Sequence, residues 1–423
     1  MGNNHKNIKK IKYKEDISDN SKINNRDIYI TPLTDYKYFN RRVFYYSEKY
    51  EISESEKKRI SELIPEKINL TEFPYTEKKE KIKIIIDTDL GTDWDDAMAI
   101  IYALNISNLE ILGITTNYGI PKLRAKVVQK ILDAYYIQHP DKKRIPVISG
   151  ASRPMGTHRE LFIFGNEGKP FYDNKELNKN LENNFIMNQE QENASNFIVE
   201  QIKKYPNEVK IVSIGIPTNI GLALKNNKEI IPLINEIIIM GCGSIFNINN
   251  IEDYEPVKEI LEGKNVVLYP NHNISGDTIA SKFLFDSNIK TKIVSHSVSS
   301  QFWSEGPVID FLRENAKNEK DIKNPKTIEG AVGLLMEEWF KRRHQNGQCP
   351  HDPLTINEAI FDGDDSPIIY ARGYIILHEW AAFSTFIPRN DGPHYLGIKV
   401  KNNNNFLKKL ENTIIGNTSD KKI

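Results

Sequence analysis

The chain has 423 residues with 57 basic and 57 acidic side chains, a balance that gives no electrostatic reason to expect nucleic acid or an anionic membrane as partner. Its two cysteines, Cys242 and Cys349, provide no disulfide framework and fit a reducing compartment. No apolar run approaches the roughly 20 residues of a membrane span, and no apolar segment near the N-terminus is typical of a secretion signal, so we expect a cytoplasmic protein.

The first 80 residues are polar and charged, and they contain few apolar runs. The composition of 3–25 predicts disorder, whereas the aromatic residues of 36–50 indicate a segment that packs on the rest of the protein. Ser53-x-x-Glu56 is a capping box that predicts a short helix. None of these segments carries recognisable chemistry, and we interpret 1–80 as a partly disordered N-terminal extension.

From Lys81 onward, apolar β-branched runs alternate with segments of helical period. The predicted strands are 82–87, 110–115, 146–149, 209–215, 236–240, 266–269 and 292–294. The predicted helices are 95–104, 122–136, 194–204, 219–225, 256–262, 276–285 and 327–343. This alternation predicts an α/β fold with a mostly parallel central sheet and helices on both faces.

Towards the C-terminus, 368–374 and 375–383 have the apolar character of two strands or a hairpin beside the main sheet. Residues 406–415 are predicted to form a closing helix. We therefore expect one catalytic domain over 81–415, followed by a polar tail at 416–423.

Aspartates are concentrated where the first predicted strand turns into the first predicted helix. Five of them fall within ten residues, at positions 87, 89, 93, 95 and 96. N-capping and the helix dipole explain Asp95 and Asp96, but they do not explain the other three. Because close carboxylates repel each other unless a cation lies between them, and because hard cations prefer oxygen ligands, the cluster predicts a divalent-metal site.

Other polar residues follow the later strands, where ligands bind in parallel α/β sheets. Asn117 follows the second strand, Thr218 and Asn219 follow the fourth, and His351-Asp352-Pro353 lies far along the chain. Each also has a local explanation. An asparagine near a glycine is ordinary in turns, and Thr218, Asn219 or Asp352 can cap a helix.

These residues together resemble the nucleoside hydrolases of the inosine–uridine preferring family. Asp87-x-Asp89-x-Gly91-x-x-x-Asp95-Asp96 is similar to the family's amino-terminal signature, in a form with three residues instead of one between the glycine and the aspartate pair. The later motifs follow in family order across most of 81–360: Asn117, Pro217-Thr218-Asn219, Met240-Gly241, Phe246-Asn247 and His351-Asp352-Pro353. The resemblance implies the family's Rossmann-like fold.

The resemblance also implies a role for each matching residue. Calcium would be bound by the carboxylates of Asp89, Asp96 and Asp352 and by the backbone carbonyl of Thr218. Asp89 would act as general base, and the ribose hydroxyls would be bound by Asp95, Asn117 and Asn247. His351 would donate a proton to the departing base, since imidazole titrates near neutrality. Ile245 stands where the family has a ribose-binding glutamate, which is the largest departure.

The function that we expect is calcium-dependent hydrolysis of the N-glycosidic bond of ribonucleosides, giving free base and ribose. The resemblance implies a small nucleoside as substrate and a homo-oligomer, either a dimer or a tetramer. Two alternatives stay open. Asp87-x-Asp89-x-Gly91-Thr92 also resembles the nucleophile loop of haloacid dehalogenase-type phosphatases, and Ile245 leaves room for a nucleoside-binding protein without activity.

Overall fold

The computed structural model describes most of the chain after residue 80 and three short strands before it. These parts are 9–11, 28–30, 41–45, 81–91, 93–156, 161–163, 167–173, 176, 191–242, 266–268, 271–360, 366–378, 383–401 and 405–416. The predicted helix after Ser53, the predicted helix 256–262 and most of the segment predicted to be disordered lie outside the described residues. The strands β1 (Lys9–Ile11), β2 (Ile28–Ile30), β3 (Arg41–Tyr45) and β7 (Leu161–Ile163) form an antiparallel sheet in that order.

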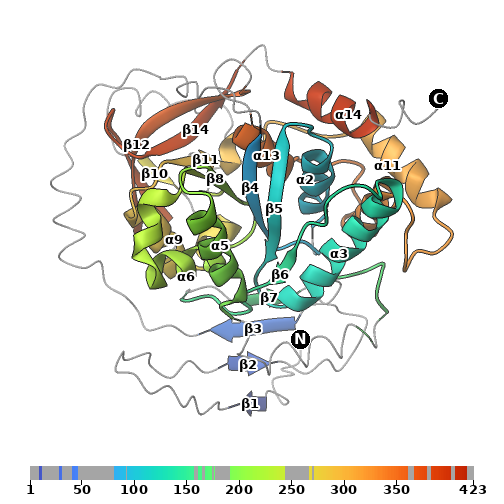
Figure 1. Ribbon diagram of the computed structural model, residues 1–423, viewed down its shortest axis with the longest axis horizontal. Helices are drawn as coiled ribbons and strands as arrows, with labels where there is room; N and C mark the ends of the chain where they lie inside the picture. Colours follow the sequence, from blue (N-terminus) through green and yellow to red (C-terminus); the bar gives the residue numbers. More distant parts are fainter. Residues whose placement is uncertain are drawn as a thin grey trace, which may run out of the picture.

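The main sheet has ten strands (Figure 1). In chain order they are β4 (Ile82–Thr88), β5 (Leu109–Thr116), β6 (Val147–Ser149), β8 (Val209–Ser213), β9 (Glu236–Met240), β10 (Val266–Leu268), β11 (Thr291–Val294), β12 (Ile368–His378), β13 (Phe383–Pro388) and β14 (His394–Val400). Their order in space is β10-β13-β12-β14-β11-β9-β8-β4-β5-β6. The strands from β14 to β6 run parallel, and β12, β13 and β10 add an antiparallel edge. The predicted mostly parallel sheet is confirmed.

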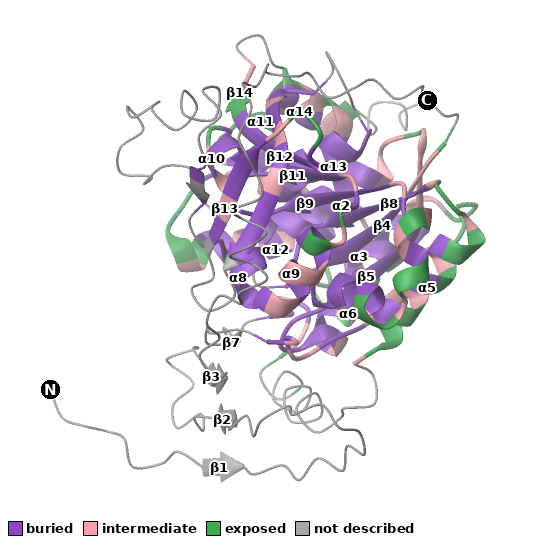
Figure 2. Cartoon of the chain, turned by 90° about the vertical axis from the view of Figure 1, so that its left-hand side faces the viewer, coloured by how far each residue is buried: buried purple, intermediate pink, exposed green. Residues whose placement is uncertain are grey.

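Helices cover both faces of this sheet (Figure 2). They are α2 (Asp95–Leu104), α3 (Pro121–Gln138), α5 (Asn193–Lys204), α6 (Thr218–Asn226), α8 (His272–Gly276), α9 (Thr278–Asp286), α10 (His296–Ser299), α11 (Pro307–Asn318), α12 (Ile328–Arg343), α13 (His351–Ile360) and α14 (Phe406–Gly416), with a 3₁₀ helix at Lys228–Leu233. Ile84 and Ile86 face the core that contains α2, α3, α12 and α13, whereas Ile85 faces the core of α5, α6 and α9. Because β4 is buried on both faces, it is a continuous apolar run rather than an alternating one.

The predicted elements between 82 and 343 that fall on described residues, which excludes the helix 256–262, agree with the structure to within a few residues at their ends. The predicted helix 276–285 is preceded by a separate short helix, α8, which Asp277 separates from α9. The helix α11 was not predicted. Near the C-terminus, the strand β12 (368–378) continues across the boundary between the predicted 368–374 and 375–383, and β13, which begins at Phe383, is its hairpin partner. The strand β14 was missed because His394, Gly397 and Lys399 interrupt its apolar run.

The direction of the chain connections changes at β4. The next strands, β5 and β6, lie on one side of it, and β8, β9 and β11 lie on the other. In open α/β sheets such a switch point opens a crevice at the carboxyl ends of the strands, which is where ligands bind. The fold therefore directs attention to the residues that follow β4 and β8.

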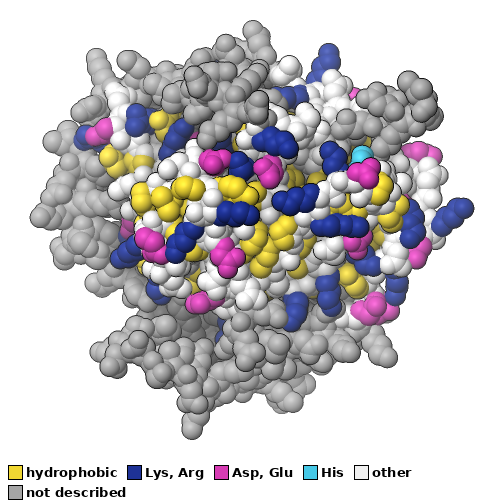
Figure 3. All heavy atoms as spheres, viewed as in Figure 1, with side chains coloured by type: hydrophobic (Ala, Val, Ile, Leu, Met, Phe, Trp, Pro, Cys, Tyr) yellow, Lys and Arg dark blue, Asp and Glu magenta, His cyan; other side chains and the backbone are white. Residues whose placement is uncertain are grey.

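The charges on the surface agree with the balanced composition of the chain. On the face shown in Figure 3, basic and acidic side chains are interspersed rather than gathered by sign, as the balanced composition predicts. Among the described residues, no helix combines the length and apolar character that crossing a membrane requires.

Candidate active site

A pocket with a volume of about 320 Å³ lies at this switch point of the sheet. Residues that follow β4, β5 and β8 contribute to it, including Asp89, Tyr118 and Ile214, and Met240 at the end of β9 joins them. The first turn of α13 contributes His351 and Asp352. Residues that are far apart in the sequence therefore meet at the carboxyl edge of the sheet.

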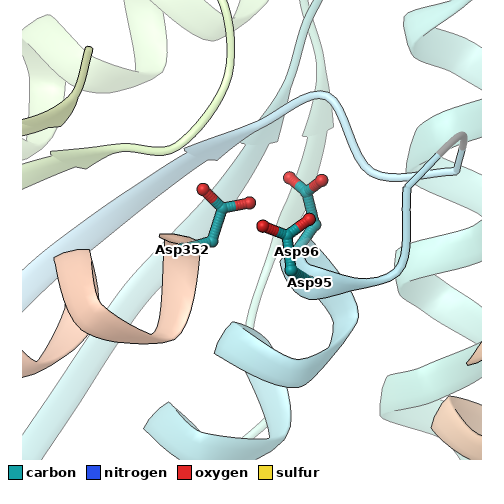
Figure 4. Close-up of side chains that lie close together, drawn as sticks. All are labelled: Asp95, Asp96 and Asp352. Atoms are coloured by element: carbon teal, nitrogen blue, oxygen red, sulfur yellow. The ribbon is translucent and has the colours of Figure 1, made fainter. Parts of the chain in front are cut away.

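Three carboxylates form the centre of this pocket. Oxygen atoms of Asp95, Asp96 and Asp352 all lie within 4.8 Å of one another, and Figure 4 shows the side chains directed toward a common point. Their relative exposures are only 5%, 3% and 4%. Asp89 and Asp93, from the turn between β4 and α2, line the same pocket.

The local structure explains how these acids converge. Asp95 and Asp96 occupy the first turn of α2, and Asp352 occupies the first turn of α13. The two helices pack against each other with both N-termini at the cluster (Figure 4). The positive end of a helix dipole favours a negative charge at this position, so both helices support ionised carboxylates.

Burial of the three carboxylates and their mutual repulsion instead favour the protonated, neutral form. Burial raises the pKa of Asp95, Asp96 and Asp352 well above its ordinary range, and the neighbouring carboxylates raise it further. Such a cluster is costly unless a cation neutralises it. The donors are all oxygen atoms, which is the preference of calcium and magnesium, and the residues therefore fit a hard divalent cation.

Arg124, which also lines the pocket, forms hydrogen bonds to the backbone of the turn that carries Asp89. Its guanidinium group donates to the backbone carbonyls of Asp89, Leu90 (3.1 Å) and Tyr118 (2.9 Å), and only 2% of this residue is exposed. Gly91 has a φ of 129°, a conformation that side chains rarely allow, so the glycine of the motif is required by the turn. Arg124 thus bonds to backbone atoms of this turn and not to the Asp89 carboxylate, whose Oδ2 lies 3.9 Å from Nε2 of His272.

Asp87 has a different role from the other acids of the motif. It is fully buried, and its carboxylate accepts hydrogen bonds from Thr115 (2.6 Å), Asn117 (3.0 Å) and Asn219 (2.7 Å). Burial raises its pKa to about 7. Asp87 is thus a structural link between β4, β5 and α6.

Two predicted site residues make hydrogen bonds to buried carboxylates and do not line the pocket. Among the described residues that line the pocket, neither Asn117 nor Thr218 is present. Asn117 donates to Asp87, and the hydroxyl of Thr218 donates to Asp277 at 2.8 Å. Ile214 does line the pocket, and its carbonyl accepts a hydrogen bond from Asn273 (3.2 Å), which is itself a pocket residue. The carbonyl of Ile214 is therefore an alternative to that of Thr218 as a backbone ligand.

The predicted ribose-binding residue Asn247 and the substituted position Ile245 lie outside the described residues. The structure instead places Asn271 and Asn273 in the pocket, two residues that the sequence analysis missed. Asn273 donates to the carbonyls of Ile214 and Met240, and Asn271 caps α8. The available signal was an Asn-x-Asn sequence shortly after the predicted strand 266–269.

His351 lies in the pocket as predicted, but its environment contradicts the reason for choosing it as a proton donor. Its Nδ1 lies 2.7 Å from the hydroxyl oxygen of Ser299, and its ring stacks on that of His296 with 5.3 Å between the centroids. Burial, with a contribution from His296, lowers the pKa of His351 to about 3. The side chain is therefore neutral at physiological pH rather than close to its titration midpoint.

Comparison with known proteins gives one consistent result. The family model described as inosine-uridine preferring nucleoside hydrolase matches residues 84–394. Uridine nucleosidase 1 of Arabidopsis thaliana is 29% identical over 283 residues, which cover 64% of this chain and 72% of that protein. The pyrimidine-specific ribonucleoside hydrolase RihA of Salmonella typhi is 28% identical over 283 residues, covering 65% and 78%.

Solved structures agree at the level of the fold. A purine-preferring ribonucleoside hydrolase from Gardnerella vaginalis superposes with a TM-score of 0.58 at 23% identity, covering 79% of this chain and 98% of that one. The plant nucleoside hydrolase PpNRh1 gives a TM-score of 0.51 at 19% identity, covering 79% and 99%. The shared region begins within β4, so 1–80 lie before it.

Proposed function

Because this chain belongs to the inosine-uridine preferring nucleoside hydrolase family, we propose that it uses a bound calcium ion to hydrolyse ribonucleosides to free base and ribose. Hydrolysis of ribonucleosides follows from membership of the family and from its relatives, which are named as uridine nucleosidases and ribonucleoside hydrolases. The metal and the roles of individual residues are the part that we add. The observation that carries this part is the convergence of Asp95, Asp96 and Asp352 on one point.

The proposed ligands of the ion are the carboxylates of Asp89, Asp96 and Asp352, with the carbonyl of Ile214 as a backbone donor. All four residues line the same pocket. A bound calcium ion would have room in its shell of about 6–8 oxygen atoms for water and sugar hydroxyls, and it would make that water more acidic. The excess of buried negative charge explains why the cluster needs the ion.

Asp89 is our candidate for the general base, because it lines the pocket and Arg124 bonds to its backbone carbonyl rather than to its carboxylate. Asp95 accepts hydrogen bonds from ribose hydroxyls, and the amide groups of Asn271 and Asn273 are further candidates for sugar contacts. Cleavage of an N-glycosidic bond passes through an oxocarbenium-like transition state, as in glycoside hydrolysis generally. The negative potential of the acid cluster stabilises the positive charge that then develops on the sugar.

In this proposal the leaving base contacts the part of the pocket that is lined by His351 and His296, whose rings stack. With its pKa at about 3, His351 acts as a neutral hydrogen-bonding group for the base and not as a protonated acid. This replaces the role expected from the sequence. A homo-oligomeric state and a cytoplasmic location stay predictions from the sequence.

The phosphatase alternative is disfavoured by the position of Asp87. In that interpretation the first aspartate of Asp-x-Asp is the nucleophile, which must reach its substrate. Here it is fully buried and accepts three hydrogen bonds from Thr115, Asn117 and Asn219. The family match excludes it independently.

A panel of purine and pyrimidine ribonucleosides tests the proposal. We expect release of free base from at least one of them, loss of activity after treatment with a calcium-selective chelator, and recovery when calcium is returned. Magnesium serves as the control cation, since its smaller octahedral shell fits such a carboxylate cage less well. Binding of nucleosides without turnover in the presence of calcium would instead establish the non-catalytic alternative.

A further inference from the structure

The helix α13 is held at both ends by polar contacts, although it is buried along its length. Its first turn carries His351 and Asp352, which line the pocket. At its other end, the Nζ of Lys292 donates to the carbonyl of Glu358 at 2.8 Å, and the Nζ of Lys210 donates to the carbonyl of Ala359 at 3.0 Å. These carbonyls belong to the last turn, where a helix lacks partners of its own.

Both lysines are unusual for their burial. Lys292 on β11 is 0% exposed and Lys210 on β8 is 9% exposed. Lysine is almost never buried without a charged or hydrogen-bonding partner, because the desolvation cost is large. Lys210 also forms an ion pair with Glu236 at 3.1 Å. Neither lysine lines the pocket, so the catalytic chemistry does not account for them.

Further contacts fix the same end of the helix. The carboxylate of Glu358 accepts hydrogen bonds from Tyr370 (2.6 Å), Ser366 (2.7 Å) and Asn357 (3.1 Å). The hydroxyl of Tyr102, near the end of α2, donates to Asn357 at 3.2 Å. The two helices that supply the acid cluster are thus joined near their C-termini as well as meeting at their N-termini.

This arrangement is electrostatically consistent. The helices α2 and α13 lie side by side in the same direction, so their negative ends are close together, which is unfavourable. Cations at a helix C-terminus offset that charge, and Lys292 and Lys210 occupy this position on α13. Asp352 at the positive end of α13 and the two lysines at its negative end therefore both interact favourably with the dipole of this helix.

We propose that Lys292 and Lys210 are positioning residues. They fix the position of α13 along its axis, and therefore the position of Asp352 relative to Asp95 and Asp96, which sets the affinity of the acid cluster for a divalent cation. An α-helix rises 1.5 Å per residue, and a shift of α13 by even part of one residue separates carboxylates whose oxygen atoms now lie within 4.8 Å. The inference rests on the cation of the proposed function and adds to it the residues that hold its site in register.

The test is calcium binding by Lys292→Met, measured by titration calorimetry on the full chain at a temperature well below unfolding. Methionine keeps the length of the side chain and removes the donor. We expect the dissociation constant for calcium to rise roughly 10–100-fold, the range found when groups that orient metal ligands are removed. Lys210→Met should act in the same direction.

Ile293→Val is the matched control. It lies next to Lys292 on β11, but its side chain belongs to the core on the opposite face of the sheet, so it perturbs the strand without touching α13. Calcium affinity in this variant should equal that of the wild type. If Lys292→Met fails to fold, Tyr102→Phe, which removes only the hydroxyl that links α2 to α13, should weaken calcium binding in the same sense.

The outcomes separate this inference from the proposed function. Equal calcium affinity in the wild type and the lysine variants overturns the positioning role and leaves the hydrolase proposal intact. Weaker binding in the lysine variants, combined with a wild type that hydrolyses no ribonucleoside, supports the positioning role and overturns the proposed activity. A wild type that binds no calcium contradicts both.

Discussion

Replacing Asp89 with asparagine is expected to lower kcat for the best ribonucleoside by about 10²–10⁴-fold, the usual contribution of a general base. Asparagine has the same shape but accepts no proton from water. The fold should survive, because Arg124 bonds to the backbone carbonyl of Asp89 and not to its carboxylate. Steady-state kinetics with saturating calcium, accompanied by a melting curve, give the measurement.

Asp93→Asn is the control for this variant. Asp93 lies in the same turn and lines the same pocket, but its carboxylate accepts hydrogen bonds from Gln348 and from the backbone of Trp94 (2.8 Å). Its replacement should therefore cost much less activity than that of Asp89. Undiminished turnover in Asp89→Asn would remove this residue from the role of base.

The second large effect is expected from Asp352→Asn, and its sign depends on calcium. Without calcium the variant should melt at a higher temperature than the wild type at pH 7, because one of three mutually repelling buried carboxylates has been removed. With calcium at 100 times its dissociation constant, the wild type should gain about 2.7 kcal/mol of stability. The variant should gain little, and its hydrolytic activity should be lost with the ion.

The same linkage predicts a pH dependence. The pKa of Asp95, Asp96 and Asp352 is raised in the folded state, so the folded protein binds more protons than the unfolded chain. The stability that these three groups contribute without calcium is then fully present below the ordinary carboxyl pKa of 3.8 and is lost as the pH rises through the raised values. Melting curves in a chelator from pH 4 upward should show this fall, with a shallower slope for Asp352→Asn. A slope that is identical in both proteins would contradict the proposed coupling.

The sequence predicted the central sheet well because burial on two faces leaves a direct trace. The run Ile84–Ile86 is apolar at every position, since one core covers each face of β4. The acid cluster was also predictable, because N-capping and the helix dipole explain only two of the five carboxylates in this turn. Asp352, more than 250 residues away, was connected to it through a family motif and not by any local property.

The differences between the expected and the observed site have physical causes as well. The orientation of the Asn117 side chain depends on its hydrogen bond to Asp87, and no sequence pattern specifies that partner. A backbone carbonyl has no side-chain signature, so preferring Ile214 to Thr218 required the fold. The pKa of His351 reflects burial and the neighbouring ring of His296, and both are consequences of packing.

The most direct test of this account is a crystal structure of the protein grown with calcium, with the ion located by its anomalous scattering. We expect one ion with carboxylate oxygens of Asp89, Asp96 and Asp352 at about 2.3–2.6 Å, the range for calcium–oxygen bonds. A saturated crystal in which calcium lies elsewhere, or in which these three side chains bind no ion, would contradict the claim that they form one metal site.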